Sequence, residues 1–471
     1  MPASAWNWPR GEAAAGRYRS TAMIASRLSP VLRGSGILLT MFASAAAAER
    51  QLTQAPYGHV LTNVNVWSPD SRWIVYDVRS VDSVFDGTRI EQVNVETGEV
   101  QVLYAARDGA ACGVVTYHPR EPKVIFIHGP ERPAPDWSYG ASRRRGAIVD
   151  TRRPGESRPL DAMTYAPPFV PGALRGGSHV HVFSPDGAWI SYTYEDEVLA
   201  RLGPSPDVGH DVNQRNVGVS VPAPAGAVRV PRTHPRNHDG DYFSVLVTRT
   251  VNRPRPGSDE ISKAYEEGWI GRRALAFLGN VTAPDGREHA EVFVVDLPED
   301  LTRPGDGPLE GTAVRRPAPP QGVVQRRLTF TSGRRFPGVV TAPRHWVRAS
   351  PDGTQLAFLM HDDAGVVQLW TISPRGGDPR QVTRKPTGIA SAFTWSPDGR
   401  RIGHTMDGAV CTTDIATGRT ERLTGARSEA GSPEPLACVF SPDGRHLAFT
   451  RRVTTVAGTF AQVFVVTTPS P

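Results

Sequence analysis

The segment F-S-P-D-G-R-H-L-A-F, residues 440–449, is one of five copies of a short phrase in this chain of 471 residues. Most copies place an aromatic residue before a Ser-Pro-Asp-Gly turn and an apolar alternation after it. Pro fixes φ for a type I turn, Asp accepts bonds from nearby amides, and Gly tolerates the left-handed conformation that follows. The other copies are W-S-P-D-S-R-W-I-V-Y from Trp67, F-S-P-D-G-A-W-I-S-Y from Phe183, A-S-P-D-G-T-Q-L-A-F from Ala349 and W-S-P-D-G-R-R-I-G-H from Trp395.

Each copy predicts a strand, a tight turn and a second strand. A single copy would be an ordinary turn, but five copies between strand-like flanks indicate an array of similar units. The 46 Gly and 43 Pro residues suit a turn-rich β protein. We therefore predict an all-β fold, a single β-propeller.

The first 48 residues differ from the rest of the chain. Arg27 and Arg33 precede an apolar run at 36–42, and small residues follow at 43–48, which is the order of regions in a signal peptide. Residues 1–48 are therefore expected to be a signal peptide or leader, with Met23 a candidate start. A propeller domain at 49–471 would then be periplasmic or secreted, with a cytoplasmic location as the alternative.

Charge and cysteine content exclude several classes of protein. The formal charge is +6, but residues 1–48 hold five Arg and one Glu, so the remainder has 48 basic and 46 acidic residues. This balance gives no support for nucleic-acid binding. No other segment has membrane-spanning length, so no transmembrane segment is expected. The three cysteines lie in or beside strand-like runs without a CxxC spacing, so we expect buried apolar residues: Cys112, Cys411 and Cys438.

A second phrase marks the outer strands and sets the blade count. Leu-Thr or Val-Thr follows a polar residue at 327–329, 381–383 and 422–424, each time ahead of a strand-turn phrase. Together with a degenerate copy at 117–120, these phrases predict seven blades, and six is the alternative. The predicted blades begin near residues 63, 113, 179, 230, 345, 391 and 436.

The same outer-strand phrase, Gln51-Leu52-Thr53, stands near the start of the chain with no blade before it. The last blade has only three strands, the third of them near 462–466. We therefore predict that an N-terminal strand completes the last blade, with Leu52 beside Phe464, because closure removes exposed sheet edges.

The blade near residue 230 has the weakest pattern. Either Asn237-His238-Asp239-Gly240 replaces the usual turn, or the segment 242–250 is its first strand. Residues 274–278 and 292–297 fit its second and third strands. The stretch 253–271 is predicted to be an insertion with a short helix, acting as a surface excursion, a lid or a partner contact.

Candidate site residues follow from the propeller geometry, because residues just before each first-strand turn converge on one face of the channel. Polar side chains dominate these positions in four of the predicted blades, whereas the last two contribute mostly apolar groups. The candidate ligand-binding residues are Asn63, Asn65, His179, His181, Arg232, His234 and His345.

Converging imidazoles can bind a divalent metal or carry out acid–base chemistry. The metal-ligand candidates are the four histidines, and Arg232 could hold a substrate carboxylate. Such histidines also serve as structural hydrogen-bonding groups with ordered water. A divalent metal is the only cofactor that the pattern suggests, and catalytic residues cannot be assigned. The sequence contains no G-x-S-x-G, P-loop, dinucleotide fingerprint or H-E-x-x-H motif.

The S-P-D-G phrases resemble the TolB-like propeller repeats of bacterial periplasmic proteins. Longer stretches resemble the YidR family of uncharacterised bacterial propeller proteins over about residues 50–467. This resemblance implies a propeller and brings no established activity. It rests on segments 58–63, 179–186, 257–260, 265–269 and 365–379.

Two functions remain open at this stage. The first is a monomeric, non-enzymatic scaffold of the cell envelope that holds a protein partner or a small polar or carbohydrate ligand on the channel face. The second is a metal-dependent enzyme on acidic sugars, since oligogalacturonate lyases are also propellers with a His-rich centre. That second similarity is architectural only, and fold analogy does not decide between them.

Overall fold

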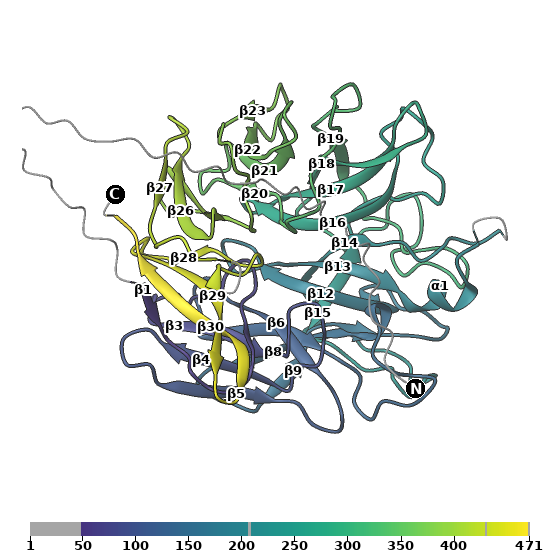
Figure 1. Ribbon diagram of the computed structural model, residues 1–471. Helices are drawn as coiled ribbons and strands as arrows, with labels where there is room; N and C mark the ends of the chain where they lie inside the picture. Colours follow the sequence, from purple (N-terminus) through teal and green to yellow (C-terminus); the bar gives the residue numbers. More distant parts are fainter. Residues whose placement is uncertain (1–48, 206–208, 429–430, 470–471) are drawn as a thin grey trace, which may run out of the picture. The chain divides into compact units, whose positions relative to one another are not determined.

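The computed structural model describes residues 49–205, 209–428 and 431–469. Seven four-stranded antiparallel sheets follow one another along this part of the chain and are arranged as the blades of a β-propeller (Figure 1). The predicted fold class and the count of seven blades are confirmed. The expected leader, residues 1–48, lies outside the described residues.

Blades are numbered in chain order, and each runs from its innermost to its outermost strand. Blade 1 contains β2 (His59–Val60), β3 (Trp73–Val78), β4 (Arg89–Asn94) and β5 (Val100–Ala105). Blade 2 contains β6 (Cys112–Tyr117), β7 (Lys123–His128), β8 (Arg145–Asp150) and β9 (Ser157–Pro159). Blade 3 contains β12 (Gly176–Phe183), β13 (Ile190–Asp196), β14 (Asn216–Pro222) and β15 (Tyr242–Leu246).

The remaining blades follow the same plan. Blade 4 contains β16 (Ile261–Ile270), β17 (Ala274–Thr282), β18 (Glu288–Asp296) and β19 (Val324–Arg327). Blade 5 contains β20 (Arg348–Ala349), β21 (Leu356–His361), β22 (Val367–Ile372) and β23 (Arg380–Gln381). Blade 6 contains β24 (Thr394–Trp395), β25 (Arg401–Met406), β26 (Ala409–Asp414) and β27 (Thr420–Arg422).

Blade 7 is built from both ends of the described chain. Its strands are β28 (Val439–Phe440), β29 (His446–Thr455), β30 (Gly458–Thr467) and, outermost, β1 (Glu49–Gln51). Outside the blades lie the parallel pair β10 (Ala162–Met163) and β11 (Ala173–Leu174), the 3-10 helix η1 (Ala141–Arg143) and the helix α1 (Glu197–Leu202).

The five S-P-D turns share one hydrogen-bond pattern. In the second copy, Ser184 Oγ donates to Asp186 Oδ1 at 2.6 Å and accepts from the amide of Trp189 at 3.0 Å. The same two bonds recur in the other copies. Gly187 has φ of 80°, the left-handed conformation that the turn requires. The motif therefore dictates the same hairpin wherever it occurs.

The predicted closure of the ring is confirmed. Gln51 pairs with Phe464, and the Leu52 amide donates to the Val463 carbonyl at 2.8 Å. Thr53 Oγ1 accepts from the amide of Val463 at 2.9 Å. The threonines of the other outer-strand phrases, Thr329, Thr383 and Thr424, make the equivalent bond within their own blades.

Indole groups tie neighbouring blades together at the residue before the turn. Trp67 Nε1 donates to the Val439 carbonyl of blade 7 at 3.0 Å. Trp395 Nε1 makes the matching bond to the carbonyl of Arg348 at 2.9 Å. Apolar side chains fill the remaining space between blades, as in the buried cluster that joins blades 1 and 7.

The predicted start of blade 4, near residue 230, was wrong. Its innermost strand is β16, so residues 253–271 are not an insertion with a helix, and 242–246 form the outer strand of blade 3. The strand β16 turns into β17 through only residues 271–273, so the S-P-D-G signature is absent there. Trp269 nonetheless fills the position before the turn, because its Nε1 donates to the Val182 carbonyl at 2.9 Å.

In the described part of the chain, no helix has the length and apolar character needed to cross a bilayer. The helix α1 has six residues.

Candidate functional site

The inner segments of blades 1 to 4 share an unusual backbone feature where they line the channel. A non-glycine residue with left-handed φ stands in each: Asn65 at 51°, Val114 at 57°, Val180 at 55° and Glu266 at 55°. Such a conformation is costly for a branched side chain and is concentrated at functional sites. The register of β6, β12 and β16 against the second strand shifts at this position. Blades 2 to 4 therefore have bulged inner strands, and blade 1 carries its left-handed residue just after its inner strand.

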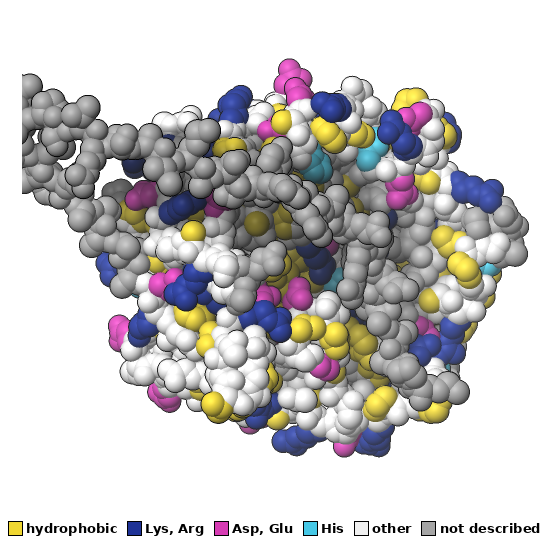
Figure 2. Space-filling view, viewed as in Figure 1, with side chains coloured by type: hydrophobic (Ala, Val, Ile, Leu, Met, Phe, Trp, Pro, Cys, Tyr) yellow, Lys and Arg dark blue, Asp and Glu magenta, His cyan; other side chains and the backbone are white. Residues whose placement is uncertain are grey.

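Side chains of several kinds gather near the middle of the ring. Figure 2 shows basic, acidic and histidine side chains together in a hollow there. We use "channel mouth" for the end of the ring at which the chain enters the inner strands. The loops from β3 to β4, from β7 to β8 and from β13 to β14 lie at this end, because second and first strands are antiparallel.

Asn63 and Arg348 meet although they belong to blades 1 and 5. The buried Asn63 amide oxygen accepts a hydrogen bond from Arg348 Nη2. Blades 1 and 5 are not neighbours in the ring, so this contact spans the channel. Asn63 was predicted from the sequence as a channel residue, whereas its partner Arg348 was not.

His179 lies on β12 at the channel mouth, and its side chain is buried. Its Nδ1 is 3.2 Å from the Thr193 carbonyl. Burial lowers the pKa of His179 far below its usual value, and the positive charges of Arg144, Arg215 and Arg344 lower it further. His179 is therefore neutral near pH 7 and is surrounded by cations.

His181 lies in a buried polar network, in which its Nδ1 has no hydrogen-bond partner. Its Nε2 is 3.0 Å from Ser178 Oγ, which donates to the buried Asp161 at 2.7 Å. Ser244 and Ser220 also donate to Asp161. Asp161, Ser178 and His181 are fully buried, and their bonds to one another form a structural network.

His345 is also a structural residue. Its Nε2 accepts from the amide of Leu359 at 3.1 Å, and its Nδ1 is 3.1 Å from the carbonyl of Pro343. Burial lowers the pKa of His345 to about 4. Both ring nitrogens are thus used to hold backbone groups, which leaves neither for a ligand.

The prediction that Arg232 and His234 line the channel was wrong. Both lie in the connection from β14 to β15, which leads to the outer strand of blade 3. Arg232 is largely exposed and pairs with Asp239 at 3.2 Å, and His234 lies 5.2 Å from the Trp137 ring. The error follows from the misplaced start of blade 4, because the true channel positions of that blade are on β16.

The predicted metal centre is not formed. No group of three or more His, Cys, Asp or Glu side chains within the described ranges is arranged to hold a metal ion. His181 is enclosed by its serine and aspartate neighbours, His345 holds two backbone groups, and His234 belongs to an outer connection. The four histidines do not fit a shared divalent ion.

Glu267, on the inner strand β16 of blade 4, was not predicted from the sequence. It precedes Trp269 by two residues, as His181 precedes Phe183, so the two occupy equivalent positions in blades 4 and 3. Glu267 is 1 % exposed, and its Oε2 accepts from Thr193 Oγ1 at 2.8 Å. Its Oε1 has no hydrogen-bond partner. Burial raises the pKa of Glu267 to about 7.

Arg348 is a buried cation beside Glu267. Burial lowers the pKa of its guanidinium to about 10. The negative charge of Glu267 opposes this change and raises the pKa. A Cβ placed on Gly268 would lie 2.2 Å from the Val347 carbonyl and 3.5 Å from Arg348 Nη1, so β16 and β20 approach closely here. No carboxylate of the described residues lies within 4.0 Å of Arg348.

Two more buried polar atoms near Arg348 are unsatisfied. Trp346 Nε1 and Thr62 Oγ1 have no partner, and the Arg348 guanidinium lies 5.8 Å from the Trp346 ring centre. Trp346 belongs to the core cluster against which Val64 and Leu436 pack from blades 1 and 7. Because buried polar groups are nearly always hydrogen-bonded, unsatisfied groups on residues around Arg348 are compatible with a polar ligand or ordered water there.

Charged side chains of both signs lie around His179. Arg215 pairs with Glu195 at 2.7 Å, and Arg344 pairs with Glu266 at 2.8 Å. Arg344 also faces the negative charge of Asp82. The two further cations without a carboxylate within 4.0 Å among the described residues are Arg144 and Lys263.

Arg144 and Lys263 differ in how they are held. Arg144 is 7 % exposed, Nη1 donates to Tyr139 Oη at 3.2 Å, and Nε has no partner. Lys263 Nζ lies 4.2 Å from the ring centre of Tyr265. Burial and the charge of Arg215 lower the pKa of Lys263. Tyr139 also stacks on Phe85 at 4.5 Å, which adds an aromatic wall to the channel mouth.

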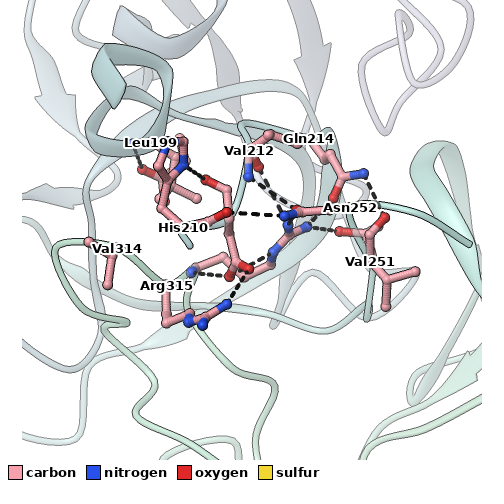
Figure 3. A network of polar contacts seen from close by, with 12 residues as sticks. Leu199, His210, Val212, Gln214, Val251, Asn252, Val314 and Arg315 are labelled. Atoms are coloured by element: carbon pink, nitrogen blue, oxygen red, sulfur yellow. Dashed lines mark hydrogen bonds and ion pairs between the residues drawn. The ribbon is translucent and has the colours of Figure 1, made fainter. Parts of the chain in front are cut away.

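A long connection of blade 4 is fixed against blade 3 close to this site. Figure 3 shows the network, in which Arg315 donates to Asp211 and the adjacent Arg316 donates to Gln214 and Asn252. The fully buried Arg175, directly before β12, pairs with Asp196 at 2.8 Å and donates to the Arg315 carbonyl at 2.7 Å. These contacts hold the start of β12, and hence His179, in position.

Two small cavities lie away from the channel mouth. Their volumes are about 70 and 140 Å³, and both are lined by Lys123 and Ile148 of blade 2. The smaller one also borders His118 and Tyr242. Neither contains the unsatisfied groups described above, so the channel mouth is the better candidate.

Comparison with one solved structure, an oligogalacturonate lyase, supports this architecture. A family model described as "Protein of unknown function (DUF3748)" matches residues 111–238. Among solved structures, oligogalacturonate lyase in complex with manganese is similar, with a TM-score of 0.56, 12% identity and coverage of 91% of this chain and 95% of that one. TolB from Acinetobacter baumannii gives a TM-score of 0.35 at 14% identity, over 87% of this chain and 84% of that one. At such identities, the lyase shows the fold alone.

A curated relative has much higher similarity. The uncharacterised protein YidR of Escherichia coli strain K12 is 52% identical over 405 residues, which cover 85% of this chain and 94% of YidR. This match spans most of the propeller. The chain belongs to the YidR family of uncharacterised β-propeller proteins.

Proposed function

We propose that this propeller is a binding protein that holds a small organic anion in its channel mouth. The observation that supports this most strongly is Arg144, a buried guanidinium with an unpartnered Nε and no carboxylate within 4.0 Å among the described residues. Burying an uncompensated charge is costly, so a ligand carboxylate beside Arg144 would stabilise the site. The neighbouring cations Lys263 and Arg344 would add to the attraction.

The binding hypothesis is favoured over a metal-dependent enzyme on acidic sugars. That enzyme would need the four histidines to share a metal ion, and they do not fit one. Neutral His179 beside several cations suits the recognition of a bound anion. We also propose that the protein acts in the periplasm, since residues 1–48 have the order of regions of a signal peptide.

Thermal shift with acetate as the probe tests the proposed function. A ligand that binds only the folded state raises the Tm in proportion to the logarithm of its concentration. We expect acetate, at constant ionic strength, to raise the Tm of the wild type and not that of Arg144→Gln. Arg152→Gln is the matched control, because Arg152 is 70% exposed and pairs with Asp150 on the outside of blade 2. An equal response of all three proteins would contradict the proposal.

A further inference from the structure

The unsatisfied groups near Arg348 differ in kind from the cations around His179. Glu267 Oε1 can only accept a hydrogen bond when ionised, whereas Trp346 Nε1 can only donate one. Thr62 Oγ1 can do both. A ligand group that satisfies an acceptor and a donor in one place must itself donate and accept, and a hydroxyl group does so.

The hydroxyl-type groups and the cationic groups are linked through neighbouring residues. Arg144 acts on His179, which pairs with Thr193 on β13. Thr193 in turn donates to Glu267 at 2.8 Å, and Gly268, the residue after Glu267, packs against Val347 and Arg348. The site thus runs from an unpaired cation to a carboxylate with a free oxygen over adjacent blades.

We propose that the ligand is a polyhydroxy acid, whose carboxylate binds beside Arg144 and whose hydroxyl groups bond with Glu267 and Trp346. The proposal rests on the proposed function and names the chemical class of the anion. A simple anion would satisfy Arg144 alone and leave Glu267 Oε1 and Trp346 Nε1 without partners. A neutral polyol would leave the Arg144 charge uncompensated. Only a molecule with both kinds of group completes the whole site.

Calorimetric titration of the full chain with three probes tests this proposal. The probes are acetate, D-gluconate and D-sorbitol, which present the carboxylate alone, both groups, and hydroxyls alone. We expect gluconate to bind about tenfold or more tightly than acetate, because a hydrogen bond to a charged group contributes about 1.5–3 kcal/mol. Sorbitol should bind the most weakly.

Variants separate the two parts of the site. Glu267→Leu and Trp346→Phe should reduce gluconate affinity about tenfold and leave acetate affinity unchanged. Arg144→Gln should weaken the binding of both acetate and gluconate, and Arg152→Gln should weaken the binding of neither. The two substitutions at the hydroxyl subsite remove opposite hydrogen-bonding roles, so the test survives if one variant fails to fold.

The contrary outcomes are distinguishable. Equal affinities for acetate and gluconate, unaffected by Glu267→Leu and Trp346→Phe, would overturn the polyhydroxy acid and leave anion binding intact. Absence of binding by both acids would overturn the proposed function together with this inference. Sorbitol binding as tight as gluconate binding, with no effect of Arg144→Gln, would overturn the role of the carboxylate.

Discussion

Arg348 of blade 5 donates a hydrogen bond across the channel to the side chain of Asn63 of blade 1. Both residues are buried, and blades 6 and 7 separate them on one side of the ring. The contact therefore connects two blades that share no sheet edge. It also fixes the guanidinium next to Glu267 and Trp346.

Removal of the Asn63 acceptor should destabilise the protein. Asn63→Ala leaves a buried guanidinium without its only hydrogen-bonded side chain among the described residues, at a cost of about 2 kcal/mol. Chemical denaturation of wild type and variant measures this difference. Asn63→Asp should recover at least part of the loss, because a carboxylate also accepts from Arg348. Unchanged stability of Asn63→Ala would show that the contact is not formed in solution.

Glu267 should make stability depend on pH in a defined direction. Its pKa is about 7 when folded and 4.5 as the ordinary value, so the folded state binds the proton more tightly. The protonated carboxyl contributes about 3 kcal/mol to the free energy of unfolding. This contribution is complete below pH 4.5 and is lost as pH rises through 7. Denaturation of wild type and Glu267→Gln from pH 5 to 8 isolates the effect. The gap between the two proteins should move in favour of the variant as pH rises, and a constant gap would contradict the assignment.

The indole hydrogen bonds between blades should each contribute a similar amount to the free energy of unfolding. Trp269→Phe removes the hydrogen bond to the Val182 carbonyl and keeps an aromatic ring, so a loss of about 1 kcal/mol is expected. Trp67→Phe and Trp395→Phe should behave alike. Phe183 and Phe440 occupy the same position in other blades, which shows that phenylalanine fits there. A loss at Trp67 and Trp395 but none at Trp269 would argue against the equivalence of blade 4.

The left-handed residue on β6 should reverse the usual preference between alanine and glycine. In an ordinary strand, a protein with glycine is less stable than the same protein with alanine by roughly 0.5–1 kcal/mol. At φ of 57°, the Cβ of alanine is disfavoured, so Val114→Gly should be at least as stable as Val114→Ala. Melting temperatures of the two variants decide the matter. Greater stability of the alanine variant would indicate ordinary strand geometry at this position.

Local turn chemistry explains why most of the fold could be predicted. The Ser184-Pro-Asp-Gly segment satisfies its own backbone, so its hairpin does not depend on distant residues. The threonine of each outer-strand phrase likewise bonds within its own blade, which made the closing strand at Leu52 recognisable. Repetition of these local rules was sufficient to count the blades.

The candidate site could be predicted only in part because it depends on contacts between blades. Asn63 and His179 could be predicted from their positions before the turns, whereas Glu267 could not, because blade 4 turns without the Ser-Pro-Asp-Gly signal. Trp269 was the available signal, as an aromatic residue followed closely by Gly271. The roles of His181 and His345 are set by a buried aspartate network and by backbone groups, which residue type alone does not reveal.

The pairing of β1 with β30 also has a consequence for biosynthesis. Glu49 leaves the ribosome first, whereas its partner Val466 is made more than 400 residues later. At 5–20 residues per second, the early strand waits roughly 20 to 80 s before its hydrogen-bonding edge can be covered. The nascent protein therefore passes through a stage with six blades made and an unpaired N-terminal strand, when chaperone protection would matter most.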